Sequence, residues 1–342
     1  MQVKGDYCYD LLVAKTKQKL AYKAGENYAE WKKSVRAKFI ELTGLDKIKA
    51  NAEGCPLNID IEREEKKDGY TQIRFTFESE PGAIVPCYML IPNTSKEKYP
   101  VAITLQGHYQ GGMYGSIGEI RVESDRNYQP RGAFAVQAVK NGYIALAIEQ
   151  RAMGERRPSA DNRQSDMCAF SALRAFNLGR TLVGERVWDI SRAIDCLASF
   201  EKCDLEKIVV TGNSGGGTAS FYAGCYDERI KVVAPSCAFC SYQTSIMDMF
   251  HCACNYIPQA YECFEMQDLA CLIAPRKFVP IAGKEDQIFP IHGVRAGFET
   301  VKAIYREENA EENCKLYETP KGHWWCEDIV WPAINEEMKK LN

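Results

Sequence analysis

The sequence predicts an α/β fold in which helices flank a mostly parallel central sheet. Three observations support this prediction. Short apolar runs typical of buried strands alternate with longer stretches of helical periodicity. Polar loops containing glycine follow several of these runs, as expected where parallel strands end at one edge of a sheet. With 342 residues, the chain has the length of one large domain with decorations.

The first part of the chain predicts a helix that precedes the sheet. Residues 27–43 carry large apolar side chains at intervals of three and four residues, and Gly44 follows as a stop. This helix would pack on the main domain or on another subunit, so a homo-oligomer stays open. We expect residues 1–50 to form a helical extension and residues 51–342 to form the main domain.

The elements of the main domain follow in alternation. Residues 56–92 alternate between β-rich runs and turns, as expected for the antiparallel edge of a sheet. The strands predicted after that edge are Tyr99–Leu105, Tyr143–Ile148, Lys207–Thr211, Ile230–Ala234, Phe278–Ala282 and Lys315–Glu318, with helices over Phe134–Val139 and Val187–Leu197. The connection over residues 236–274 is longer than an ordinary crossover and predicts a cap-like insertion.

A glycine-rich pentapeptide follows the predicted strand Lys207–Thr211. Its sequence, Gly212-Asn213-Ser214-Gly215-Gly216, matches the G-x-S-x-G turn of a nucleophile elbow. In such a turn the serine occupies a strained position between a strand and a helix, and a Cβ on either flanking glycine would clash. Ser214 is therefore the candidate nucleophile, and the N–H of Gly215 can donate to an oxyanion.

One candidate acid and one candidate base follow the serine in the order Ser, Asp, His. Asp286 lies in a polar turn after one predicted strand, and His323 lies in a loop after the next. The other three histidines precede the serine, lie in the long insertion or follow Asp286 too closely; these are His108, His251 and His292. Taken singly, Asp286 suits turn chemistry and His323 suits packing. Their order at the ends of separate strands predicts a Ser-His-Asp triad.

Further loops at the same edge predict an oxyanion donor and a pocket. The loop Gln106–Gly112 follows the strand Tyr99–Leu105, and the backbone N–H of His108 is the expected second donor. The loop Glu149–Pro158 is rich in charge and either lines a polar pocket or is tethered by Arg–carboxylate pairs. The predicted substrate-binding residues are Tyr109, Arg151, Glu155 and Trp324.

The predicted insertion adds a second source of pocket residues. Its aromatic side chains would form one wall of a small acyl pocket, or they would only cover the core. These residues are Phe239, Tyr242, Phe250, Tyr256, Tyr261 and Phe264. A phosphate-binding loop is not expected, because neither G-x-x-x-x-G-K-[ST] nor G-x-G-x-x-G is present.

Several segments resemble the acetyl xylan esterase-like branch of the α/β-hydrolases, a carbohydrate esterase and dienelactone hydrolase-like group. The resemblance covers roughly residues 55–335 and rests on Leu182–Asp189, Gly212–Thr218, Asp227–Lys231, Pro235–Cys237, His251–Pro258 and Ala274–Arg276. It implies the α/β-hydrolase fold and a serine esterase, without a cofactor, that acts on small acyl esters, mainly acetyl, of sugars or xylan fragments. Ser214 would match the nucleophile of the family, Asp286 its acid and His323 its base.

The resemblance is less specific for the substrate. In cephalosporin C deacetylase relatives the elbow reads Ser-Gln-Gly, whereas this chain has Ser214-Gly215-Gly216, which argues against cephalosporin-like substrates. Ala152 also stands where such relatives favour glycine. A broad carboxylesterase, a prolyl-peptidase-like hydrolase and a catalytically silent binding protein remain as alternatives; the silent protein would lack a triad member.

Composition argues against some classes of partner and indicates where in the cell the protein is found. A formal net charge of −3 suggests no nucleic-acid or acidic-membrane partner, and no apolar stretch has the 18 or so residues that span a bilayer. The polar start of the chain does not resemble a signal peptide, and 15 cysteines indicate reduced thiols, so we expect a cytoplasmic protein.

One cysteine-rich group of residues has part of the spacing of a metal site. Cys237-x-x-Cys240 has the spacing of half a zinc site, but a single residue separates Cys252 from Cys254, beside His251. We therefore expect no metal, with free thiols that pack as small hydrophobic groups.

Overall fold

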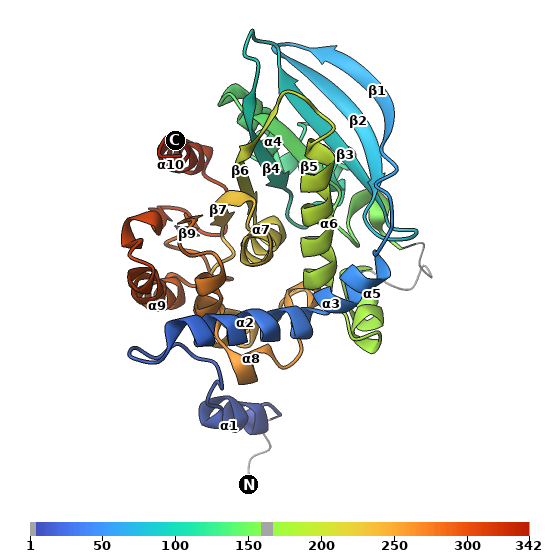
Figure 1. Cartoon of the computed structure of the whole chain (residues 1–342). Coiled ribbons are helices and arrows are strands. Elements are labelled where there is room, and N and C mark those ends of the chain that lie inside the picture. The colour runs from blue at the N-terminus through green and yellow to red at the C-terminus, as the bar shows by residue number, and fades with distance from the viewer. Residues whose placement is uncertain (1–4, 159–166, 342) are drawn as a thin grey trace.

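The computed structural model describes residues 5–158 and 167–341 and shows a ten-stranded sheet at its centre (Figure 1). The order is β1-β2-β3-β5-β4-β6-β7-β9-β10, with β8 paired to β7. Strands from β1 to β5 along this order pair antiparallel, and those from β5 to β10 pair parallel, which confirms the predicted fold class. The strands are β1 (Asp60–Lys67), β2 (Tyr70–Glu78), β3 (Ile84–Pro92), β4 (Tyr99–Leu105), β5 (Ile144–Ile148), β6 (Cys203–Asn213), β7 (Ile230–Ser236), β8 (Lys277–Phe278), β9 (Ile281–Gly283) and β10 (Tyr317–Thr319).

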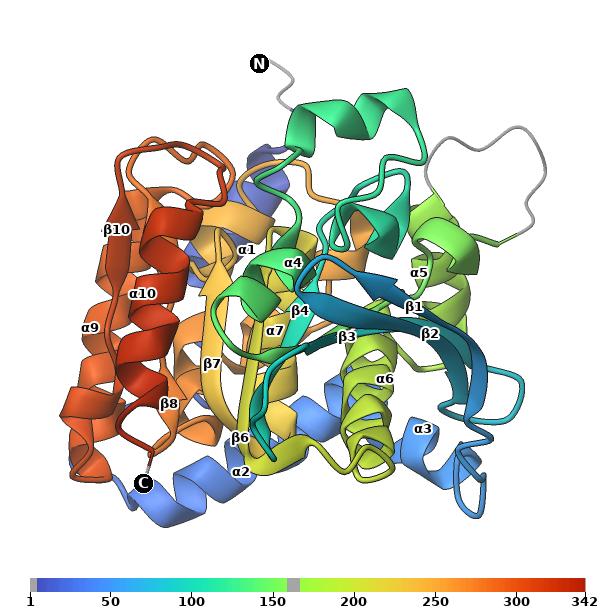
Figure 2. The same cartoon turned by 90° about the horizontal axis from the view of Figure 1, so that it is seen from above.

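Helices cover both faces of the sheet. Side chains of α4 and α10 share one buried apolar cluster, and those of α2, α3, α6, α7 and α9 share another, so the two sets lie on opposite faces. Figure 2 shows β1 and β2 at one end of the sheet and β10 with α9 and α10 at the other. The helices are α1 (Tyr7–Lys15), α2 (Tyr28–Thr43), α3 (Leu45–Asn51), α4 (Phe134–Lys140), α5 (Met167–Asn177), α6 (Leu182–Leu197), α7 (Gly215–Tyr226), α8 (Ala260–Cys263), α9 (Ile291–Glu307) and α10 (Glu327–Met338).

The predicted helix over residues 27–43 is confirmed as α2. The Asn27 side chain accepts a hydrogen bond from the N–H of Glu30 at the first turn, and Gly44 ends the helix in the left-handed conformation. The apolar face of α2 packs on this chain, where the ring of Phe39 stacks on Tyr222 of α7. The division between extension and main domain at residue 50 stays a prediction.

The predicted strands are present, with one interruption. The run Phe278–Ala282 is divided into β8 and β9, because Pro280 lies between them and has no N–H to donate to a neighbouring strand. No helix in the described part of the chain has the length and apolar character that a membrane crossing requires.

Three aromatic side chains of the insertion over residues 236–274 lie in the core. Phe239, Tyr242 and Phe264 are at most 3% exposed, and the ring of Phe239 packs on Phe278. All three belong to the buried apolar cluster that includes side chains of α7. These three side chains therefore cover the core, which is the second of the two roles expected for them. Phe250, in contrast, is 90% exposed.

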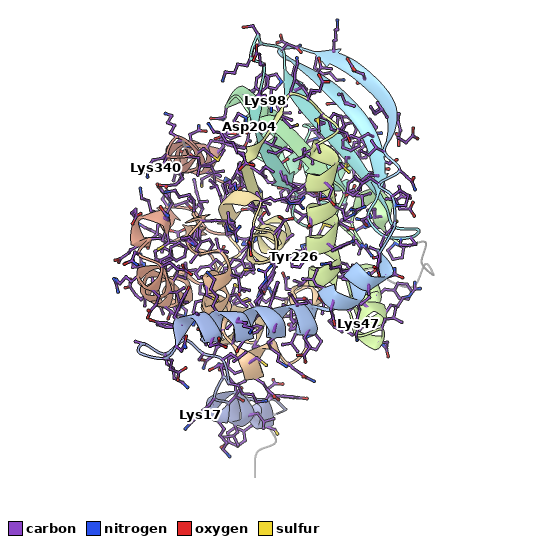
Figure 3. All side chains as sticks on the ribbon, in the orientation of Figure 1. Lys17, Lys47, Lys98, Asp204, Tyr226 and Lys340 are labelled. Carbon is purple, nitrogen blue, oxygen red and sulfur yellow. The ribbon has the colours of Figure 1, made fainter. Side chains whose placement is uncertain are left out.

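The two ends of the parallel strands differ in character. Lys98 and Asp204 lie at the end where β4 and β6 begin (Figure 3). The opposite end, where Leu105 pairs with Gly212, carries the loops that hold the predicted site residues. This arrangement follows the rule that open α/β sheets place their sites at the carboxyl ends of the strands.

Candidate active site

Ser214 forms the sharp turn between β6 and α7. Its backbone has φ 57° and ψ −124°, a strained conformation for a residue with a Cβ, and its N–H donates to the carbonyl of Ser236 at 3.0 Å. A Cβ on Gly212 or on Gly216 would collide with the carbonyl oxygen of Leu105 on β4. The turn thus requires glycine on both sides of the serine, and it holds Ser214 half-buried at the end of the strand.

Asp286 and His323 form a hydrogen-bonded pair. Asp286 Oδ2 lies 2.9 Å from His323 Nδ1, and Asp286 Oδ1 accepts from the N–H groups of Ile288 at 2.8 Å and Phe289 at 3.0 Å. Burial raises the pKa of Asp286, but the hydrogen bond and charge of His323, together with the two amides, lower this pKa more, so it lies below its ordinary value. An ionised carboxylate therefore fixes the orientation of the imidazole.

The second ring nitrogen of His323 has no hydrogen-bond partner among the residues that the structure describes. The side chain is 23% exposed, and Phe289 stacks on the ring with centroids 5.9 Å apart. Among the described residues no hydrogen bond joins His323 to the hydroxyl of Ser214. In hydrolases without substrate this contact is often long, and it shortens when substrate binds. The triad stays a prediction, with two members in contact and the third on a nearby strand end.

The loop after β4 passes directly over the serine turn. A Cβ on Gly107 would lie 3.4 Å from the Cβ of Ser214, and a Cβ on Gly215 would lie 2.9 Å from Cε1 of His108. The N–H groups of His108 and Gly215 have no acceptor among the described residues. Two unpaired donors beside a serine have the composition of an oxyanion hole, as predicted for these residues.

A buried carboxylate that the sequence analysis missed holds this loop. Glu149, the residue after β5, accepts from the side-chain amide of Gln106 at 2.7 Å and from the N–H of Met113 at 3.2 Å. Burial raises the pKa of Glu149 to about 7, an effect that backbone hydrogen bonds only partly offset. Its position directly after a buried strand is the signal that would have identified it.

Arg151 lies in a network of ion pairs. Its guanidinium donates to Asp189 at 3.0 Å and to Glu80 at 2.6 Å, and it lies 3.5 Å from Glu185. The carboxylates of Glu80 and Asp189 are at most 3% exposed. These contacts support the alternative in which Arg–carboxylate pairs tether this loop, and a role of Arg151 in substrate binding stays a prediction.

Two further predicted substrate-binding residues are also engaged elsewhere. The carboxylate of Glu155 accepts from Arg74 at 2.7 Å and from the hydroxyl of Tyr114 at 2.6 Å. Tyr109 is 6% exposed and stacks on Tyr128 with centroids 4.4 Å apart. Tyr109 is therefore buried, whereas Glu155 stays exposed although its carboxylate is hydrogen-bonded, and the substrate-binding role of both residues stays a prediction.

Trp324 keeps the geometry of a binding residue. Its side chain follows His323 directly and is 42% exposed. The guanidinium of Arg131 lies 3.6 Å from the ring centroid, a cation–π contact. Arg131 forms no ion pair with any carboxylate that the structure describes, and the sequence analysis missed it because residues 131 and 324 are distant in the chain.

The metal constellation weighed from the sequence is dispersed. His251 contacts the hydroxyl of Ser245, Cys240 contacts Thr244, and Cys237 lies beside the Asp286–His323 pair. Cys252 and Cys254 instead lie close to two residues from other segments, His108 and Cys168.

Comparisons with known proteins identify the family and the fold. A model of the Abhydrolase family matches residues 9–325. "Putative hydrolase YtaP" of Bacillus subtilis (strain 168) is 25% identical over 260 residues, which cover 75% of this chain and 83% of that protein. A crystal structure of "a putative acetyl xylan esterase" from Bacteroides fragilis NCTC 9343 has a TM-score of 0.75 at 19% identity, covering 94% of this chain and 83% of the other. The glucuronoyl esterase from Solibacter usitatus has a TM-score of 0.66 at 16% identity, with 96% and 99% covered. These structural similarities show a shared fold.

Proposed function

The chain belongs to the Abhydrolase family, and from this premise we propose that it is a serine esterase that removes small acyl groups, mainly acetyl, from carbohydrate esters such as xylan fragments. The observation that supports this most is the hydrogen bond between Asp286 and His323, because the other imidazole nitrogen, which lies near a strained serine turn, has no partner in the described part of the chain. The structural relatives named as acetyl xylan esterases support the substrate class.

The proposed reaction is acyl transfer to water. His323 Nε2 takes the proton of Ser214, and the serine oxygen attacks the ester carbonyl. Asp286 holds the tautomer in which His323 Nδ1 carries the proton, and its charge stabilises the imidazolium. The N–H groups of Gly215 and His108 bind the oxyanion, and the loss of one such donor would raise the barrier by about 3 kcal/mol. His323 then protonates the departing sugar oxygen and activates the water that releases the acyl group.

Labelling and a substrate series test this proposal. A fluorophosphonate probe should label the wild-type protein and not Ser214→Ala, whereas a silent binding protein would stay unlabelled. Among p-nitrophenyl esters, acetate should be preferred over octanoate by at least about tenfold in kcat/KM, which corresponds to about 1.4 kcal/mol. Release of acetate from acetylated xylo-oligosaccharides would support the carbohydrate substrate. A rate that is flat or rises with acyl length would identify a broad carboxylesterase instead.

We also propose a cytoplasmic location. All fifteen cysteines are free thiols in the structure, a pattern typical of a reducing compartment. Fractionation of the native host, with immunodetection in the soluble cell extract and the medium, tests this location.

A further inference from the structure

Four side chains of the kinds that bind transition metals converge beside the loop after β4. They come from three segments: His108 from that loop, Cys168 from the first turn of α5, and Cys252 and Cys254 from the insertion. Their ligand atoms all lie within 4.8 Å of one another. His108 Nε2 lies 3.2 Å from Cys254 Sγ, which in turn lies 3.2 Å from Cys252 Sγ.

We propose that these four residues form a structural Zn²⁺ site with three thiolate ligands and one imidazole ligand. A tetrahedral zinc with such ligands places two sulfurs about 3.8 Å apart and a sulfur and a nitrogen about 3.5 Å apart. The separations in the structure, from 3.2 Å to at most 4.8 Å, bracket these values. Side-chain shifts of about 1 Å or less would therefore bring the ligands to coordinating positions.

The charge around the cluster suits this set of ligands. Three thiolates and one Zn²⁺ carry a net charge of −1, and each coordinating thiol releases its proton to solvent. Arg186 is 3% exposed and its Nη2 lies 3.5 Å from Cys168 Sγ. Arg186 pairs with no carboxylate in the described ranges, and its other hydrogen bonds go to the carbonyl of Arg151. The buried guanidinium can thus balance the zinc–thiolate centre.

The surroundings supply both a closed side and a route of entry. Ala152, Ala172 and Leu182 pack against the buried thiols of Cys168 and Cys254 and shield them from water. On the other side, His108 is exposed and Cys252 is half-buried, so an ion can reach the ligands from solvent. A disulfide between Cys252 and Cys254 would use only two of the four groups and would leave Cys168, His108 and Arg186 without a shared partner.

The site lies next to the proposed catalytic centre without belonging to it. The His108 ring that would bind zinc lies over Gly215, and the backbone N–H of the same histidine is the predicted oxyanion donor. The ion would therefore fasten the loop after β4 to α5 and to the insertion. Because the proposal concerns metal content, its outcome does not depend on whether the protein proves to be an esterase.

Metal analysis of matched cysteine variants tests the site. Protein purified under reducing conditions from zinc-supplemented medium should contain about one zinc per chain by elemental analysis. Cys168→Ser and Cys252→Ser should lose most of that zinc. Two control variants should retain it: Cys314→Ser, whose thiol is buried like that of Cys168, and Cys55→Ser, whose thiol is half-exposed like that of Cys252.

Cobalt and a histidine variant keep the test decisive if a cysteine variant fails to fold. Co²⁺ added to the metal-free wild-type protein should give thiolate-to-cobalt charge-transfer bands and intense tetrahedral d–d bands. His108→Ala removes an exposed side chain and keeps all thiols, and it should weaken Zn²⁺ binding at least about tenfold in competition with a chromophoric chelator. Absence of these bands, equal zinc in ligand and control variants, iron or copper in place of zinc, or a Cys252–Cys254 disulfide found by mass spectrometry would each overturn the proposal.

Discussion

Two buried aspartates of this protein have similar electrostatic surroundings and different chemical possibilities. Asp286 pairs with His323, and Asp189 pairs with Arg151 and Arg156 at 3.0 Å and 2.6 Å. Burial raises the pKa of Asp189, but the two guanidinium groups have the larger and opposite effect, so its pKa falls to about 2. The pKa of Asp286 is also below its ordinary value. Both carboxylates are therefore ionised and held by a basic partner.

The difference lies in what the partner leaves free. The guanidinium of Arg151 donates through Nε and Nη2 to the buried carboxylates of Asp189 and Glu80, and its Nη1 lies 3.5 Å from the carboxylate of Glu185, so the network around Asp189 is closed. His323 uses one nitrogen for Asp286, and within residues 5–158 and 167–341 its other nitrogen has no partner and lies at a partly exposed position. A perturbed pKa alone thus does not distinguish a reactive pair from a structural one, because reactivity also requires an unoccupied atom with access to substrate.

The largest expected effect on kcat comes from removing the proposed nucleophile, Ser214, beside the Asp286–His323 pair. Ser214→Ala should lower kcat for p-nitrophenyl acetate by roughly 10⁴-fold or more, about 5 kcal/mol, because no other hydroxyl is presented by the turn. The melting temperature and circular dichroism should match those of the wild type. A purified variant that keeps more than about a tenth of the wild-type kcat would exclude Ser214 as the nucleophile.

A substitution in the closed network around Asp189 should lower the stability of the protein rather than its activity. Asp189→Asn leaves Arg151 and Arg156 buried without their shared carboxylate and should lower the free energy of unfolding by about 3–5 kcal/mol, with kcat of the folded enzyme nearly unchanged. Urea unfolding and active-site titration measure the two quantities. Asp195→Asn is the matched control on the same helix, because its side chain is 31% exposed and should cost at most about 1 kcal/mol. A large fall in kcat with unchanged stability would place Asp189 in the catalytic machinery.

The elements that could be predicted are those whose signals are local. Tyr99–Leu105 and residues 27–43 were located closely because apolar periodicity and a stop residue mark them in the sequence. The serine turn was predicted because sterics at Gly212 and Gly216 require a fixed local pattern. Asp286 and His323 came from their order at successive strand ends, since the parallel sheet brings those ends to one edge.

The roles that were missed depend on distant partners. Arg151 pairs with Glu80 and Asp189, which are 71 and 38 residues away in sequence, so its charge alone could not show that the network is closed. Cys254 lies 146 residues from His108, and their contact exists only because α5, the insertion and the loop after β4 pack together. Spacing rules identify metal ligands that are close in sequence, and this cluster draws on three segments.

A third buried carboxylate, that of Glu149, differs from Asp189 and Asp286 because its pKa is raised, so its effect on stability depends on pH. Glu149 lacks a guanidinium partner for its carboxylate among the residues described, and burial raises its pKa from 4.5 to about 7. The folded state therefore binds the proton more tightly than the unfolded state. Its contribution to stability is fully present below about pH 4.5 and is lost as the pH rises through about 7, up to about 3 kcal/mol.

The Glu149→Gln variant isolates this contribution because glutamine does not titrate. Between about pH 5 and about pH 8 the wild type should lose about 3 kcal/mol more unfolding free energy than the variant, measured with urea at each pH. Other titrating groups are common to both proteins and cancel in the difference. Parallel pH profiles, or a wild type that gains stability relative to the variant as pH rises, would show that Glu149 is ionised throughout.

The smallest expected effect is on KM and comes from Trp324, an exposed side chain beside the Asp286–His323 pair. Trp324 lies next to His323 with its ring exposed, so it can contact a substrate that reaches the free imidazole nitrogen. Trp324→Ala should raise KM for acetylated xylo-oligosaccharides about fivefold, equivalent to about 1 kcal/mol, with kcat within about twofold of the wild type. Uniform binding of ground state and transition state predicts this separation of KM from kcat, and Trp324→Phe should restore most of the affinity.

Phe250→Ala is the matched control, because that ring is 90% exposed but lies in the insertion, and the KM of this variant should not change. A fall in kcat alone for Trp324→Ala would mean that the ring positions His323 rather than substrate, and unchanged kinetics would remove Trp324 from the binding surface.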